Sequence, residues 1–169
     1  MSWSGMRSKL ENEYLAASLR GHIQYYATSY NKCPDHEGRA AIRFDGKEII
    51  AGCYYNNWFK AALFPRDARY ERRMKEEMAF MDDTAVRLGV FDQRSFYEAF
   101  SIFDNQSIEE SLSSENMLVR IFAILDRRDG KRRLEKIRRG IEGEEKTFRE
   151  FFAIRAAAEG LRAERGEEE

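Results

Sequence analysis

The chain is poor in the residues that divide or cross-link a protein. It has only two prolines in 169 residues, and no proline-rich or glycine-serine stretch separates one part from another. Two cysteines, Cys33 and Cys53, cannot form a disulfide framework, so we expect reduced thiols. These absences predict one domain over residues 1–169, with a sheet region at 1–55 and a helical region at 56–169.

Long apolar runs are also missing. The longest is Ile121 to Leu125, far below the roughly 20 residues of a membrane span. Near the start, Arg7, Lys9 and Glu11 stand where a signal peptide would need an apolar segment. We therefore expect a cytoplasmic protein that does not enter membranes.

Signatures of catalysis are scarce as well. The sequence has no glycine-rich phosphate loop, no nucleophile elbow and no His-Glu-x-x-His, and neither histidine lies in the helical region. Asp82 and Asp83 are adjacent in a predicted helix, where their side chains point about 100° apart. These absences favour a non-enzymatic protein without a cofactor, while a site assembled from distant residues stays open.

Aromatic residues, in contrast, are abundant. Twelve Phe, eight Tyr and two Trp supply enough large apolar surface for a sizeable core, which excludes a disordered or collagen-like chain. The formal net charge is −1, so any site for a polyanion must be local.

The first part of the chain predicts a helix and a three-stranded antiparallel meander. Apolar residues recur at helical spacing over 4–20, and Gly21 follows where a glycine would end the helix. Residues 22–30, 39–44 and 47–55 are rich in strand formers, and Asp45-Gly46 between the last two is a strong hairpin signal.

The remainder predicts helices. Helical periodicity covers 66–88, and Phe91–Phe103 reads as a short helix with Asp92 as its N-cap. A capping box at Ser107–Glu110 precedes a buried face ending at Leu125. A basic helix over Lys131–Arg139 and a last helix over 147–165 complete the pattern. Strands followed by helices indicate an α+β fold with the sheet packed on the first helix.

Four segments carry a resemblance to a known family. They are MSW at the start with KLE (9–11), FDGKEI (44–49), SIEESLSSENMLVRIFAILDRRDGKRRL (107–134) and FFAIRAAAEG (151–160). In this order they resemble a family of small bacterial proteins with no established activity. The resemblance therefore implies membership and brings no catalytic or binding residue. The stretch 58–93 has no matching motif, and we expect this member to differ there.

The densest chemical feature is a basic cluster with a local charge of about +6. It contains eight basic residues in thirteen positions: Arg127, Arg128, Lys131, Arg132, Arg133, Lys136, Arg138 and Arg139. A helix, an Asp129-Gly130 turn and a second helix are compatible with helix-turn-helix geometry, in which cations reach phosphates or guanine edges.

A second interpretation of this cluster is a solvated helical face. Leu134, Ile137 and Ile141 would then be buried while the cations pair with acids such as Glu142, Glu144 and Glu145. The two interpretations predict different pairings of the same charges, so the structure bears on the choice.

The outer face of the sheet is another candidate surface. If Ile23, Tyr25 and Ala27 point to the core, the alternation of a strand places four side chains on the other face, beside two arginines of the next strand. These residues are Gln24, Tyr26, Thr28, Tyr30, Arg39 and Arg43. Aromatics with arginines can bind single-stranded bases, and the alternative is that the tyrosines are core.

Zinc is the metal to consider, because all histidines and cysteines fall within thirty-two positions. Cys33 and His36 have the spacing of a zinc half-site, and Cys53 could lie near them. His22 begins the first strand, roughly 25 Å from the loop at 31–38. We therefore expect no structural metal.

The sequence thus predicts a binding protein whose basic helix contacts nucleic acid or an acidic protein. The alternative is a small enzyme with a polar cleft between sheet and helices, where His22 or His36 would supply acid and base chemistry.

Overall fold

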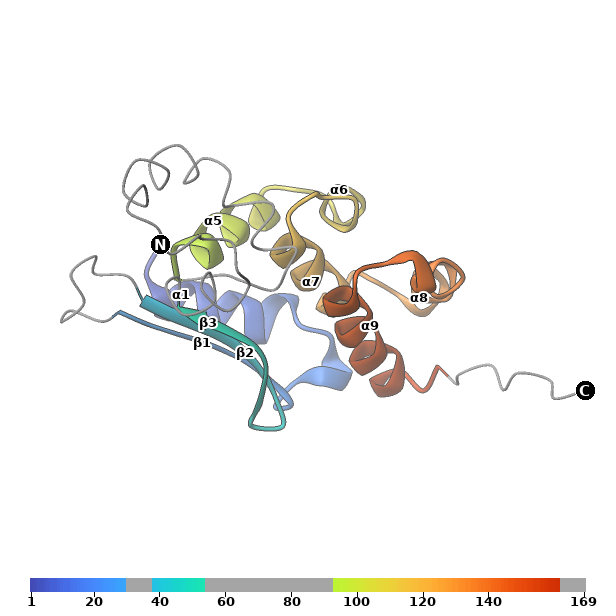
Figure 1. The fold of residues 1–169 in the computed structure, drawn as a ribbon, viewed down its shortest axis with the longest axis horizontal. Coiled ribbons are helices and arrows are strands. Elements are labelled where there is room, and N and C mark those ends of the chain that lie inside the picture. The colour runs from blue at the N-terminus through green and yellow to red at the C-terminus, as the bar shows by residue number, and fades with distance from the viewer. Residues whose placement is uncertain (30–37, 54–92, 162–169) are drawn as a thin grey trace, which may run out of the picture.

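A computed structural model describes residues 1–29, 38–53 and 93–161. The fold is α+β, as predicted: an N-terminal helical segment and a three-stranded antiparallel sheet precede a helical C-terminal half (Figure 1). The strands are β1 (Ile23–Ser29), β2 (Gly38–Phe44) and β3 (Lys47–Cys53). The later helices are α5 (Gln93–Asp104), α6 (Ile108–Leu112), α7 (Met117–Leu125), α8 (Lys131–Arg138) and α9 (Lys146–Ala158), with a short 3₁₀ turn η3 (Ile141–Gly143) before α9.

The three strands form a meander in the order β1-β2-β3. Tyr25 faces Ile42 across the first pair, and Ala41 faces Ala51 across the second. Asp45 and Gly46 connect β2 and β3 with φ angles of 49° and 78°. Positive φ at both central residues is the geometry of a type I′ turn, so the predicted hairpin is confirmed.

One face of the sheet packs on the helices through aromatic rings. Ile23 and Tyr25 are buried, as the alternation predicts. The Tyr25 ring lies 6.0 Å from Phe96 of α5 and 5.9 Å from Phe122 of α7, centroid to centroid. Phe96 and Phe122 are 5.1 Å apart in an edge-to-face arrangement. The sheet and the helical half therefore share one apolar core.

Helix α7 is the centre of the helical half. Eight of its nine residues are buried, so it has no solvent-facing stripe. The Asn116 side chain caps it by accepting from the backbone N–H groups of Leu118 and Val119. The capping box at Ser107 and Glu110 is confirmed, but it begins a separate short helix, α6.

The N-terminal helix ends earlier than the predicted 4–20. It begins as α1 (Trp3–Ser8), continues as a π-helical segment η1 (Lys9–Tyr14) and stops at Leu15, and a 3₁₀ turn η2 (Ala17–Leu19) follows. The Ala16 N–H donates to the Leu125 carbonyl, and the Tyr14 carbonyl accepts from the Arg127 N–H. These backbone groups form hydrogen bonds with the end of α7 and the residues after it, so they do not continue the helix. The spacing of apolar residues in the sequence gives no information about such a long-range contact.

The last helix is likewise shorter than the predicted 147–165. It ends at Ala158, and Gly160 follows with a φ of 68°. The N–H groups of Gly160 and Leu161 donate to the carbonyls of Ala157 and Ala156, which closes the helix end in the way typical of a glycine C-cap. Gly160 therefore stops α9 where hydrophobic spacing alone suggested continuation.

Several predictions fall outside the described residues. They concern the helix at 66–88, the N-cap Asp92, the pair Asp82 and Asp83, Tyr30, Cys33 and His36. Within the described part of the chain, no helix is long and apolar enough to cross a membrane.

Candidate functional site

Helix α8 carries the basic cluster on the surface of the molecule. Figure 1 shows it beside α9, at the end of the helical half that lies away from the sheet. Leu134 is its buried residue, and Ile137 is half-buried against the core. The preceding helix α7 is buried, so of the predicted helix pair only α8 presents a surface.

The eight cations of the cluster differ in their exposure and in their ion pairs. Five are exposed and form no ion pair with any residue that the structure describes: Arg127, Lys131, Arg132, Lys136 and Arg139. Arg128 and Arg133 instead make internal ion pairs, and Arg138 is half-buried and lines a groove beside α9. The structure therefore leaves five of the predicted site residues exposed, and helical spacing places Arg132, Lys136 and Arg139 on one face of α8.

The acids expected to neutralise these cations pair with other residues. Arg120 of α7 donates to Glu144 at 2.6 Å and to Glu145 at 3.3 Å. Glu142 accepts from Arg149 of α9 at 3.2 Å. The five exposed cations, which together form the basic surface, therefore do not pair with the three acids that the solvated-face interpretation assigned to them.

Arg128 anchors the loop that leads into α8. Its guanidinium donates twice to one oxygen of Asp126, at 2.9 and 2.7 Å, and Asp126 is fully buried. The same guanidinium lies over the rings of Tyr14 and Phe103 at 5.0 and 5.4 Å. Hydrogen bonding to Asp126 raises the pKa of Arg128 further, so this cation serves the fold.

A polar cluster continues from Arg128 toward the N-terminal helix. The Tyr14 hydroxyl and the Lys9 ammonium both donate to Asp104. Burial alone would raise the pKa of Asp104, but hydrogen bonds from Tyr14 and Lys9 outweigh it and lower that pKa. Burial and the Asp104 contact raise the pKa of Tyr14 to about 12. The cluster fixes η1 against α5.

Arg133 and Asp129 hold α8 against the rest of the helical half. Arg133 donates to Glu109 of α6 and to the Arg128 carbonyl. It also lies 3.8 Å from Asp129, which is fully buried and whose carboxylate oxygens accept no hydrogen bond from the described residues. Burial raises the pKa of Asp129 to about 6, although Arg133 and Arg155 oppose the shift.

Arg155 of α9 is a buried cation that the sequence reasoning missed. Its guanidinium donates to the Asp129 carbonyl at 2.8 Å and lies 3.4 Å from Glu159. Glu159 in turn accepts from the Ser18 hydroxyl at 2.6 Å. Two of the segments that carry the family resemblance, 107–134 and 151–160, thus meet at Asp129 and Arg155. The signal that the sequence offered for this contact was that both residues lie in segments that carry the family resemblance.

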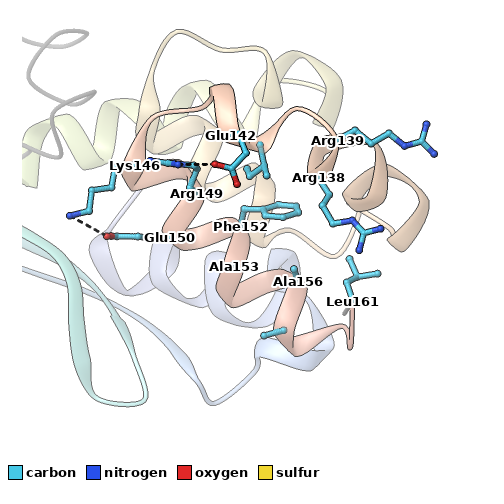
Figure 2. A pocket seen from close by; sticks show the side chains of 12 residues that line it. Arg138, Arg139, Glu142, Lys146, Arg149, Glu150, Phe152, Ala153, Ala156 and Leu161 are labelled. Atoms are coloured by element: carbon cyan, nitrogen blue, oxygen red, sulfur yellow. Dashed lines mark hydrogen bonds and ion pairs between the residues drawn. The ribbon is translucent and has the colours of Figure 1, made fainter. Parts of the chain in front are cut away.

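A groove lies between α8 with η3 on one side and α9 on the other (Figure 2). Its volume is about 800 Å³. Its apolar lining includes Phe152, Ala153, Ala156 and Leu161, and its charged lining consists of Arg138, Arg139, Lys146, Arg149, Glu142 and Glu150. The groove adjoins the basic surface, since Arg139 belongs to both.

The structure describes five of the six residues predicted for the second candidate surface on the sheet and places them on one face: Gln24, Tyr26, Thr28, Arg39 and Arg43. Tyr26 is half-buried, and the guanidinium of Arg43 lies 4.6 Å from its ring centroid, with that of Arg39 at 5.8 Å. Both arginines pair with Glu48, whose pKa is lowered chiefly by the hydrogen bond from Arg39. Glu48 therefore holds both arginines beside Tyr26 on the strands.

In the part of the chain that the structure describes, histidine and other metal-ligating side chains are not gathered into a site. His22 is exposed, and its Nδ1 lies 2.6 Å from Asp45 at the end of the hairpin, away from the groove. Among the residues the structure describes, no group of three or more His, Cys, Asp or Glu could hold a metal ion.

Comparison with known proteins agrees with the resemblance of the four segments. A search of curated proteins and one of solved structures gave no match. A family model does match, over residues 2–156, a range that includes the 58–93 stretch. The chain therefore belongs to the SF0329 protein family.

Proposed function

We propose that this protein is a non-enzymatic binding protein that contacts nucleic acid through the exposed face of α8. The observation that carries the proposal is the pairing of charges around that helix. Five cations are exposed and unpaired among the described residues, while the nearby Glu142, Glu144 and Glu145 pair with Arg149 and Arg120. A local positive surface on a chain of net charge −1 suits a polyanion.

The rigid mounting of α8 supports the same function. The ion pairs of Arg128 and Arg133 and the contact of Arg155 with the Asp129 backbone fix the loop and the start of the helix. A helix held in this way presents its cations without first having to be ordered, which lowers the entropy cost of binding.

The test compares two variants with equal net charge. One replaces Arg132, Lys136 and Arg139 with alanine, and the control replaces Arg7, Arg20 and Lys47, three exposed cations elsewhere. Binding to a fluorescent DNA duplex is measured by anisotropy over a range of salt concentrations. We expect the α8 variant to bind more weakly and its log–log salt slope to fall by about 2 to 3, because each lost phosphate contact removes about 0.9.

Two outcomes would overturn the proposal. One is the absence of DNA and RNA binding at low salt, and the other is an equal loss of binding in both variants. Poly-L-glutamate serves as a further probe, because equally tight binding of it would assign the surface to an acidic protein.

A further inference from the structure

The groove beside α8 has features that phosphate binding does not require. Its floor is apolar, with the Phe152 side chain lying across it in Figure 2. Ala153 and Ala157 on α9 are exposed, and their small side chains leave the groove open. A volume of about 800 Å³ is in the range of sites that take organic ligands.

The charges of the groove favour an anionic occupant. Among the residues that the structure describes, four basic and two acidic side chains line it. Both acids have partners, because Glu142 pairs with Arg149 and Glu150 lies 3.9 Å from Lys146. On the α8 side, Arg139 is exposed, forms no ion pair with the described residues and is continuous with the exposed surface of α8.

A ligand that fits both surfaces must carry a row of negative charges and apolar planar groups. We infer that the ligand is a single strand of nucleic acid, with its phosphates along α8 and one or more bases in the groove. A duplex offers the same phosphates, but its bases are stacked inside and cannot enter the groove. This inference rests on the proposed function and names the form of nucleic acid that the surface takes.

Base binding in such a groove has a defined chemistry. The apolar floor receives the face or edge of a base, and a guanidinium group such as that of Arg139 can stack on it. Every base has an apolar face, so we expect little dependence on sequence. One bound base should strengthen binding by about fivefold or more.

The experiment uses the full chain and two strands that differ only in their bases. Oligothymidylate is compared with an abasic strand of the same length, which has the same phosphates. The groove is filled by Ala153→Leu with Ala157→Leu, and Ala158→Leu is the control, because Ala158 is exposed on the same helix and does not line the groove. Circular dichroism checks that each variant is folded.

We expect the wild type and the Ala158→Leu control to prefer oligothymidylate to the abasic strand by about fivefold or more. The filled variant should lose this preference and keep its salt slope, because the cations of α8 are unchanged. Equal binding of the two strands by the wild type, or an undiminished preference in the filled variant, would overturn the inference.

The proposed function has a separate readout in the same experiment. If the wild type binds both strands equally and the α8 variant binds neither, the phosphate contact stands and the base site is wrong. If no strand binds at low salt, both proposals are wrong.

Discussion

At the scale of single residues, two buried acids, one just before the basic cluster and one within it, decide what some of its cations do. Asp126 accepts both guanidinium hydrogen bonds of Arg128, and Asp129 lies beside Arg133. Two cations of the cluster therefore serve the fold, and five others form no ion pair with the residues that the structure describes. A substitution of Arg133 would weaken binding and structure together, so Arg132 is the better probe of the surface.

Asp129 gives a prediction about stability and pH. Burial raises its pKa in the folded protein to about 6, above the ordinary value near 3.8 in the unfolded chain. Ionisation of Asp129 therefore costs stability, by about 3 kcal/mol at most, as the pH rises from about 4 to about 6. The protonated form, below pH 4, is the form that the fold favours.

We expect Asp129→Asn to remove this loss. Relative to the wild type, the variant should gain up to about 3 kcal/mol in the free energy of unfolding between about pH 4 and pH 7. Urea titrations across this range measure the difference. Glu135→Gln on α8 is the control, since Glu135 is exposed. A difference between Asp129→Asn and wild type that does not change with pH would contradict the prediction.

Sequence reasoning identified the exposed part of this surface and missed its internal part. The clustered basic residues show where positive charge lies in the sequence, and six of the eight are indeed exposed. Burial of Asp126, Asp129 and Arg155 depends on contacts between segments far apart in the chain, such as the 2.8 Å bond from Arg155 to the Asp129 carbonyl. Local spacing carries no information on such contacts.

At the scale of elements, the sequence predicts best where local chemistry fixes the backbone. The Asp45-Gly46 hairpin and the capping box at Ser107 both appear in the structure. The N-terminal helix was predicted too long, because its end at Tyr14 is fixed by backbone pairing with Arg127, more than a hundred residues away. The early end of α9 had a local signal in Gly160 that hydrophobic spacing outweighed.

The hairpin provides a test at this scale. Gly46 has a φ of 78° and no atom within 4 Å of the place where a Cβ would stand. Gly46→Ala should therefore destabilise the protein by about 1 to 2 kcal/mol through backbone conformation alone. Urea denaturation measures this, and Lys47→Ala at the next position is the control. A loss as small as that of the control would show that the turn adapts without cost.

At the scale of the whole molecule, the sheet and the helices are joined through one aromatic core. Phe122 of α7 contacts Tyr25 of β1, Phe96 of α5 and Phe103 of α5. A sheet of this size has little stability of its own, because three short strands bury too little apolar surface without the helices packed on them. We propose on this ground that residues 1–169 unfold as one cooperative unit.

The prediction for that unit uses Phe122, which is almost completely buried. Phe122→Ala should lower the free energy of unfolding by about 3 to 5 kcal/mol, since it removes a large side chain and leaves a cavity. Native-state hydrogen exchange then measures the protection of the slowest-exchanging amides of β2 and of α9 separately. We expect both sets to lose the same amount of protection, because in one cooperative unit the slowest amides exchange through global unfolding. Ile102→Ala, at an exposed position of α5, should change neither set much. Loss of protection in β2 with α9 unchanged would mean that sheet and helices unfold separately.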